Sequence, residues 1–210
     1  PGRRSAGAAG RPFVNSWSDA PLLENAHVRL EQLAPEHSDD LAAAVAVDEL
    51  WRTWYTRIPS PDGMRDEIES RLDRQRAGLV APWAIVSVRD GRAVGMTTYL
   101  NLDEANRRLE IGSTWMGRAA QGIGINPAAK LLLLERAFDV LGCGAVEFRT
   151  HWHNHQSRAA IARLGAKQDG VLRNHTVWAD GTIRDTVVFS IIDGEWPTVR
   201  AALIARLRHR

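Results

Sequence analysis

Cysteine is nearly absent from this chain. Cys143 is the single cysteine in 210 residues, which excludes an intramolecular disulfide and a metal site built on paired cysteines. Its two neighbours are glycines, which predict a turn, and no base lies near it in the sequence to activate a thiol. Low cysteine content is typical of a reducing compartment, so we expect a cytoplasmic protein.

The chain also lacks a long apolar segment and an excess of charge of one sign. No run approaches the roughly 18 apolar residues that a membrane helix requires. Lys and Arg number 27 against 25 for Asp and Glu, a formal net charge of +2. A charge this small gives no long-range field of the kind that a nucleic-acid-binding protein uses. We therefore expect neither a membrane nor a nucleic acid as partner.

Length and composition predict one folded domain after a tail. Residues 1–20 are rich in Gly, Ala, Ser and Arg and offer little apolar area to offset the cost of ordering, so we interpret them as a flexible N-terminal tail. The remaining residues, 21–210, are long enough to bury one core, and 44% of the chain is hydrophobic.

Hydrophobic periodicity predicts an α/β fold. Alternating or continuous apolar patterns indicate strands, with a hairpin turn at Asp90-Gly91. Helical spacing indicates amphipathic or buried helices. The result is a mixed, mostly antiparallel sheet of about seven strands flanked by helices. The expected strands are 27–33, 83–88, 93–102, 106–116, 145–151, 171–178 and 183–192, and the expected helices are 36–47, 50–55, 64–77, 128–141, 154–164 and 195–208.

The expected strand at 106–116 carries a carboxylate. Alternation places Leu109, Ile111 and Ser113 on one face of the strand and Glu110 on the other. Glu110 therefore points away from the apolar set. From the spacing alone it is either a functional carboxylate or a solvated one.

A glycine-rich loop, with Gly122 and Gly124, joins that strand to an apolar helix. Glycines let backbone N–H groups approach an anion closely, and the following helix start presents unpaired N–H donors, so the loop suits a pyrophosphate. A plain strand-to-helix turn is the alternative. A Rossmann fold would place the glycines after the first strand, and a Walker loop would continue with Gly-Lys-Ser/Thr, which is absent here.

Two segments resemble motifs of the GNAT acyltransferases, and within them the ribosomal-protein N-terminal (alanine/serine) acetyltransferase group. The segment 119–124 is similar to the family's acyl-CoA loop, Q/R-x-x-G-x-G/A, with Ala119 where the family prefers Gln or Arg. The segment 154–166 is similar to its N-x-x-S-x-x-A-I-x-R-L-G-A block and is the more specific match. The resemblance spans roughly residues 21–197.

The resemblance implies that acetyl-CoA, or another short acyl-CoA, is the co-substrate. It implies that the strand before the loop splays from its neighbour and pairs with the pantetheine arm, with the Met116 or Trp115 N–H as oxyanion donor. Arg118 and Gln121 lie near enough to substitute for the missing side chain at Ala119. The implied CoA-binding residues are Thr114, Trp115, Met116, Gln121, Gly122, Ile123, Gly124, Ile125, Asn126, Asn154 and Ser157.

Two residues are catalytic candidates. Glu110 matches an acidic position of the family and is the expected general base, acting through water. Ser157 either protonates or hydrogen-bonds the departing sulfur, or serves only the first turn of a helix that begins near Asn154.

Histidines and aromatic residues leave further alternatives. His151, His153 and His155 alternate and could imitate a metal site, but no carboxylate or cysteine stands at ligand spacing, so no metal is expected. By resemblance, Trp51, Trp54 and Tyr55 would wall the acceptor pocket, but core packing is the simpler explanation of these aromatic residues.

The expected function is therefore transfer of an acyl group, most simply acetyl, from acyl-CoA to a primary amine, with a protein N-terminal amine as the first choice of acceptor. A small-molecule amine acyltransferase and a non-catalytic acyl-CoA-binding domain are the alternatives. If a homodimer forms, pairing through the last strand, 183–192, would bury an open edge.

Overall fold

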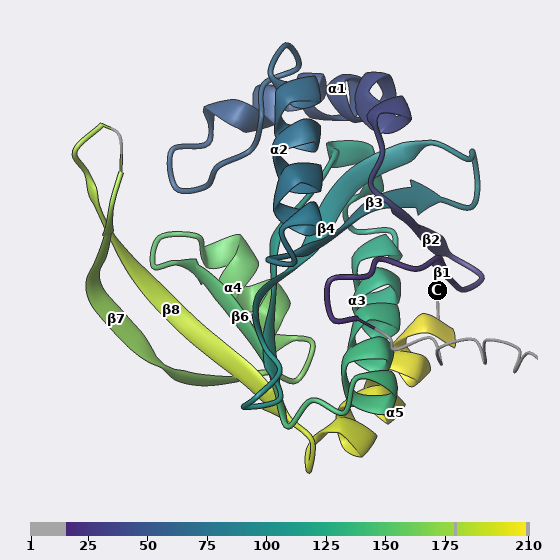
Figure 1. Cartoon of the computed structure of the whole chain (residues 1–210), viewed down its shortest axis with the longest axis vertical. Helices are drawn as coiled ribbons and strands as arrows, with labels where there is room; N and C mark the ends of the chain where they lie inside the picture. The colour runs from purple at the N-terminus through teal and green to yellow at the C-terminus, as the bar shows by residue number, and fades with distance from the viewer. Residues whose placement is uncertain (1–15, 179, 209–210) are drawn as a thin grey trace, which may run out of the picture.

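The computed structural model describes residues 16–178 and 180–208, and its centre is one twisted sheet of eight strands (Figure 1). The strand order is β1-β2-β3-β4-β5-β6-β8-β7. Every neighbouring pair is antiparallel except β5 and β6, which are parallel. The strands are β1 (Leu23–Glu24), β2 (Val28–Gln32), β3 (Ala81–Ser87), β4 (Ala93–Asp103), β5 (Arg108–Met116), β6 (Ala145–His151), β7 (Lys167–Val177) and β8 (Ile183–Ile192).

Helices cover both faces of the sheet and divide the core in two. On one face α1 (Ser38–Ala46) and α2 (Met64–Arg76) bury Leu41, Val45 and Ile68 against β3 and β4. On the other face α3 (Ile125–Glu135) and α5 (Trp196–Arg208) lie side by side. The short helix α4 (His155–Ala162) contacts β6 and β8 and joins the second core. No helix within the described ranges is long and apolar enough to cross a membrane.

The predicted α/β architecture is confirmed, with one strand more than expected. The hydrophobic patterns located β6 and β8 at their observed bounds. The additional strand, β1, has two residues and exists only because it pairs with β2, so no alternation could reveal it. The strand β7 begins at Lys167, earlier than its apolar pattern indicates, because pairing with β8 continues through polar residues.

Two helical segments differ from their sequence patterns. The helix α3 starts at Ile125, before the expected 128, because Pro127 is compatible with a first turn, and it continues into a π-helical turn, η4 (Arg136–Val140). The expected helix at 50–55 is wrong: a 3₁₀ segment, η2 (Val47–Arg52), is interrupted by left-handed Asp48 and Glu49, with φ of 65° and 48°. Residues 53–55 form no helix.

The end of the expected tail is packed against the domain. Trp17 and Ala20 belong to the buried core on the α3 face. The Arg136 guanidinium donates hydrogen bonds to the carbonyl oxygens of Ser16 and Asp19. Residues 1–15 of the expected tail lie outside the described residues.

The last strand is not an edge of the sheet. The strand β8 lies between β6 and β7, so the expected dimer through residues 183–192 would find that strand already paired on both sides. Consecutive strands are usually neighbours, which would place β7 beside β6 and leave β8 at the edge. Here β8 pairs with β6, and β7 takes the outer position.

Lys130 is a buried amine on the sheet-facing side of α3. Its Nζ donates hydrogen bonds to the hydroxyl oxygens of Thr114 at 2.8 Å and Thr97 at 3.3 Å. Within the described ranges it forms no ion pair with a carboxylate. Burial lowers the pKa of the Lys130 amine to about 7. The folded state therefore holds this proton less tightly than the unfolded chain does.

We predict that Lys130→Met stabilises the protein near neutral pH and that this advantage shrinks as pH rises. Above the folded pKa of about 7 the folded chain has lost a proton that the unfolded chain keeps up to about 10.5. The wild type should therefore gain up to about 1.4 kcal/mol per pH unit relative to the variant. Urea unfolding of both proteins at about pH 7, 8 and 9 measures the difference. A difference that does not change with pH would contradict a strongly lowered pKa.

Candidate functional site

A bulge in β5 reverses the direction of its side chains. The β4–β5 register shifts between Met96 and Thr98, opposite a left-handed Ser113 with φ of 46°. Ser113 is exposed, so the expectation that it shares a face with Leu109 and Ile111 is wrong. The bulge inserts one residue, and the alternation is offset beyond it. As a result Trp115 packs in the core on the α1 face.

The strands β5 and β6 pair for three residues only. The last parallel pair joins Glu110 to Glu147, after which the two strands are no longer hydrogen-bonded. The splay expected from the family resemblance is therefore present. The Gly117 N–H donates to the Val94 carbonyl, and the alternation of an antiparallel ladder then directs the Met116 N–H away from β4. The same alternation directs the Trp115 N–H toward β4.

The glycine loop connects the end of β5 to the start of α3. Gly122 and Gly124 are left-handed, with φ of 77° and 99°, and Gly124 caps the helix. The N–H groups of Ile125 and Asn126 lie in the first helical turn, where no intrahelical acceptor exists. Backbone donors and the positive end of the helix dipole converge there, an arrangement that suits a pyrophosphate.

Several side chains around the loop already have partners within the protein. The Gln121 amide donates to the Met116 carbonyl oxygen at 2.9 Å and accepts from Gln156 at 3.2 Å, which ties the loop to α4. Arg118 forms an exposed ion pair with Asp48. The Thr114 hydroxyl contacts Lys130 in the interior. Near the open edge of β5, Thr114 therefore offers a ligand its backbone and not its side chain.

The start of α4 also faces this region. The Asn154 Oδ1 accepts a hydrogen bond from the Ser157 N–H at 3.0 Å, so Asn154 is the helix N-cap. The Ser157 hydroxyl has no hydrogen-bond partner among the described residues. The capping function thus belongs to Asn154, and the Ser157 hydroxyl remains available.

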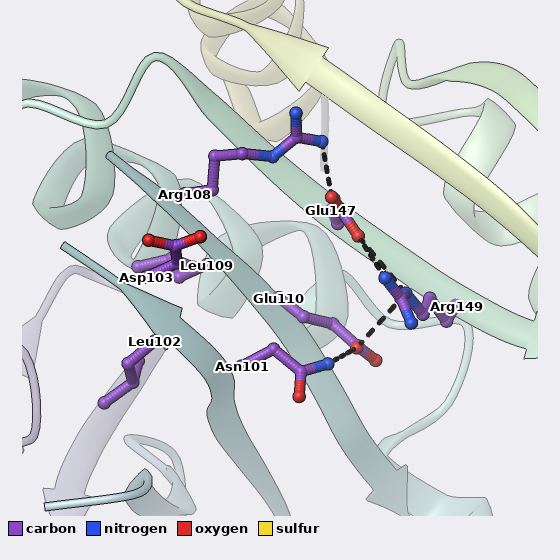
Figure 2. Close-up of a pocket in the computed structure, with 8 residues that line it drawn as sticks. All are labelled: Asn101, Leu102, Asp103, Arg108, Leu109, Glu110, Glu147 and Arg149. Carbon is purple, nitrogen blue, oxygen red and sulfur yellow. Dashed lines mark hydrogen bonds and ion pairs between the residues drawn. The ribbon is translucent and has the colours of Figure 1, made fainter. Parts of the chain in front are cut away.

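Glu110 lies in a polar pocket on the open face of β5 and β6 (Figure 2). Its carboxylate accepts a hydrogen bond from the Asn101 amide at 2.8 Å and lies 3.6 Å from the Arg149 guanidinium. The neighbouring Glu147 is held by Arg149 and Arg108. The pocket has a volume of about 420 Å³ and is lined by Asn101, Leu102, Asp103, Arg108, Leu109, Glu110, Glu147 and Arg149.

Glu110 and Glu147, two of the three carboxylates that line the pocket, differ in acidity. Burial raises the pKa of Glu110, although Arg149 and Asn101 oppose this effect. For Glu147 burial acts in the same direction, but hydrogen bonds and charge from Arg149 and Arg108 outweigh it and lower the pKa. Glu110 is therefore the stronger base of the two.

Aromatic side chains meet beside this pocket. Trp54 is 58% exposed, and its ring lies 5.3 Å from the ring of His151 and 5.5 Å from that of His153. His151 also contacts Trp178 at the end of the β7 strand, with ring centroids 5.6 Å apart. Trp51 packs against the core on the α1 face, and Tyr55 contacts Trp54. The two interpretations therefore apply to different residues: Trp51 packs against the core, and Trp54 is exposed at the site.

The sequence did not indicate Asn101, Arg149 or Trp178 as parts of the site. Asn101 reaches Glu110 from a left-handed position at a second irregularity of β4, which leaves no periodic signal. Arg149 could have been found from the sequence, because positions 147, 149 and 151 lie on the same face of β6. Within the described ranges no three His, Cys, Asp or Glu side chains are arranged to hold a metal ion. Burial raises the pKa of Cys143 to about 12, which leaves its thiol unreactive.

Comparisons with known proteins agree with this geometry. Residues 27–167 match the family model described as "Acetyltransferase (GNAT) domain". The chain is 30% identical over 176 residues to the "Putative ribosomal N-acetyltransferase YdaF" of Bacillus subtilis (strain 168), which covers 82% of this chain and 94% of that protein.

Solved structures show the same fold. A GCN5-related N-acetyltransferase from Brucella melitensis superposes with a TM-score of 0.79 at 32% identity, covering 90% of this chain and 86% of the other. RimJ of Mycobacterium smegmatis, in complex with CoA-disulfide, superposes with a TM-score of 0.73 at 23% identity, covering 85% and 88%. The family match spans most of the chain and includes the splayed strands and the glycine loop. The chain therefore belongs to the GNAT family of acetyltransferases.

Proposed function

We propose that this protein transfers an acetyl group from acetyl-CoA to a primary amine, and that the acceptor is the N-terminal amine of a protein. The main support for this proposal is that β5 and β6 separate directly after Glu110. The gap between the two strands lies between the helix start at Gly124 and the Glu110 pocket. The printed name of YdaF, a ribosomal N-acetyltransferase, supports the choice of acceptor.

The CoA half of the site would be held mainly by backbone groups. The N–H groups from Ile123 to Asn126 would bind the pyrophosphate, and the open edge of β5 from Thr114 to Met116 would pair with the pantetheine amides. Gln121 would keep the loop in place through Met116 and Gln156, and Asn154 would hold the first turn of α4. Binding through the backbone would account for a loop that has Ala119 where the family prefers Gln or Arg.

Three groups would serve the chemistry. Glu110, through a water molecule, would accept a proton from the amine as its nitrogen forms the new bond to the acetyl carbon. The Met116 N–H would donate a hydrogen bond to the acetyl oxygen, where negative charge develops. The Ser157 hydroxyl would donate a proton to the sulfur as the carbon–sulfur bond breaks. The proton taken up at Glu110 then passes through water to Ser157, which restores both side chains.

Glu110→Gln should lower the rate of acetyl transfer by about 10²- to 10⁴-fold, the usual contribution of a general base. The wild-type rate should fall as pH drops through the raised pKa of Glu110, because only the carboxylate accepts a proton. Thiol release at saturating amine across a pH series measures both effects. The matched control is Glu135→Gln, which removes a carboxylate on α3 that pairs with Arg200 and should leave the profile unchanged. An acidic limb that persists in Glu110→Gln would reject this assignment.

Gly124→Ala should weaken acetyl-CoA binding by about tenfold or more, because a left-handed alanine costs about 1–2 kcal/mol and the loop would relax away from its binding conformation. Isothermal titration measures the affinity. Gly78→Ala is the control: that glycine is also left-handed, with φ of 74°, and a Cβ there would meet no atom within 4 Å. The control should lose stability without losing affinity for acetyl-CoA, and an equal loss of affinity in both variants would contradict the loop assignment.

Ser157→Ala should lower kcat by about tenfold while acetyl-CoA affinity stays near the wild-type value, since the hydroxyl would act on the leaving sulfur. Ser70→Ala, at an exposed position of α2, provides the control. Stopped-flow or steady-state thiol release gives kcat, and thermal melting reports any loss of stability. An unchanged kcat together with a lower melting temperature would assign Ser157 to the helix turn alone.

A further inference from the structure

Three segments that are distant in sequence meet beside Glu110. The loop after η2 contributes Trp54 and Arg57, the end of β6 contributes His151, and the β7–β8 hairpin contributes Trp178 and Arg184. The Arg57 guanidinium lies over the Trp178 ring, 5.5 Å from its centroid. In Figure 1 this loop and the tip of the β7–β8 hairpin lie on the same side of the molecule.

The charges around this meeting point are not balanced. Burial lowers the pKa of Arg184, and the positive charges of Arg57 and Arg149 add to that effect, while Glu110 opposes it. Glu110 in turn responds to Arg184 and Arg149. Arg149 already pairs with Glu147 and Glu110. Glu147 offsets part of the charge of Arg149. Glu110 is the carboxylate whose charge opposes those of Arg57 and Arg149 around Arg184.

Arg184 interacts with Glu110 only through its charge and has no hydrogen-bonded partner among the described residues. Its Nε is buried and makes no hydrogen bond, and its guanidinium forms neither a hydrogen bond nor an ion pair with any described residue. Arg57 likewise forms no ion pair within the described ranges. By contrast Arg173, on the same hairpin, pairs with Asp185 at 2.6 Å. A buried donor without an acceptor is unfavourable, and a ligand that supplies the acceptor is one way to satisfy it.

We infer that Arg184, assisted by Arg57, binds an anionic group of the amine acceptor, a carboxylate or phosphate within a few bonds of the amine. The planar guanidinium matches the paired oxygens of such a group. Trp54 and Trp178 would shield the contact from water and so strengthen it. Glu110 remains beside it to receive the amine, so the site suits an acceptor that carries both charges. This inference rests on the proposed function, because it assigns the acceptor of that same site.

A purely electrostatic role for Arg184 would predict different behaviour. If Arg184 only lowered the pKa of Glu110, its loss would shift the pH profile equally for every acceptor. Recognition of an anion predicts instead a change in KM that depends on the acceptor. The two roles are therefore separable by comparing acidic and neutral acceptors at a pH on the plateau of the wild-type profile.

The experiment measures acetyl transfer from acetyl-CoA to matched pairs of acceptors. One arm uses N-terminal peptides that differ only in Asp or Asn at the second position, and the other uses a free amino acid and its amide. We expect the acidic member of at least one pair to have a KM about ten- to a hundredfold lower. Arg184→Gln should abolish that difference and leave the neutral acceptor nearly unchanged. The arm that shows the preference tells whether the anion belongs to a peptide or to a small amine.

Controls separate the inference from the proposed function. Arg173→Gln removes a neighbouring arginine that is already paired and should keep the acidic preference. Isothermal titration with acetyl-CoA and thermal melting verify that Arg184→Gln is folded. Transfer without any acidic preference, or a preference that survives Arg184→Gln, would overturn the inference alone. Binding of acetyl-CoA without transfer to any amine would overturn the proposed function and the inference with it.

Discussion

The bulge at Ser113 is the constraint on which the rest of the site depends. An inserted residue increases the local twist of β5 and turns its end away from β6, so the two strands pair only as far as Glu110. Continuous pairing would leave no open backbone edge for a pantetheine arm. The same bulge brings Thr114 to Lys130, which links the irregular strand to the helix that carries the glycine loop.

Charged groups are buried around this irregular strand with unequal compensation. Lys130 is held by two hydroxyl groups and Glu110 by one amide and one guanidinium, whereas Arg184 has no hydrogen bond to a described residue. Each burial disfavours the charged form and opposes folding to some degree. Such arrangements persist where they prepare a protein for its ligand, because the same low-dielectric surroundings that raise the pKa of Glu110 also strengthen contacts with substrate.

The two halves of the site are built by different means. In the proposed function the CoA side would rely on backbone geometry, namely a left-handed Gly124, the start of α3 and the edge of β5. The acceptor side would rely on side chains such as Trp54, His151 and Arg184, which come from a loop and two strands. Binding through the backbone would tolerate substitution of most side chains, including the alanine at Ala119. The acceptor side can therefore change its specificity while the CoA side stays fixed.

The sequence by itself determined the α/β architecture, the glycine loop and the position of Glu110 on its strand. These features follow from local rules: alternation along a strand, helical spacing, and the freedom of glycine to be left-handed. The tertiary structure alone decided that Asn101 and Arg149 hold Glu110, that β8 lies inside the sheet, and that Ser113 breaks the alternation. These features depend on pairing between strands that are far apart in the chain. Two strands, β6 and β7, separate Arg184 from Glu110 in the sequence, and only the folding of the sheet brings their charges into range.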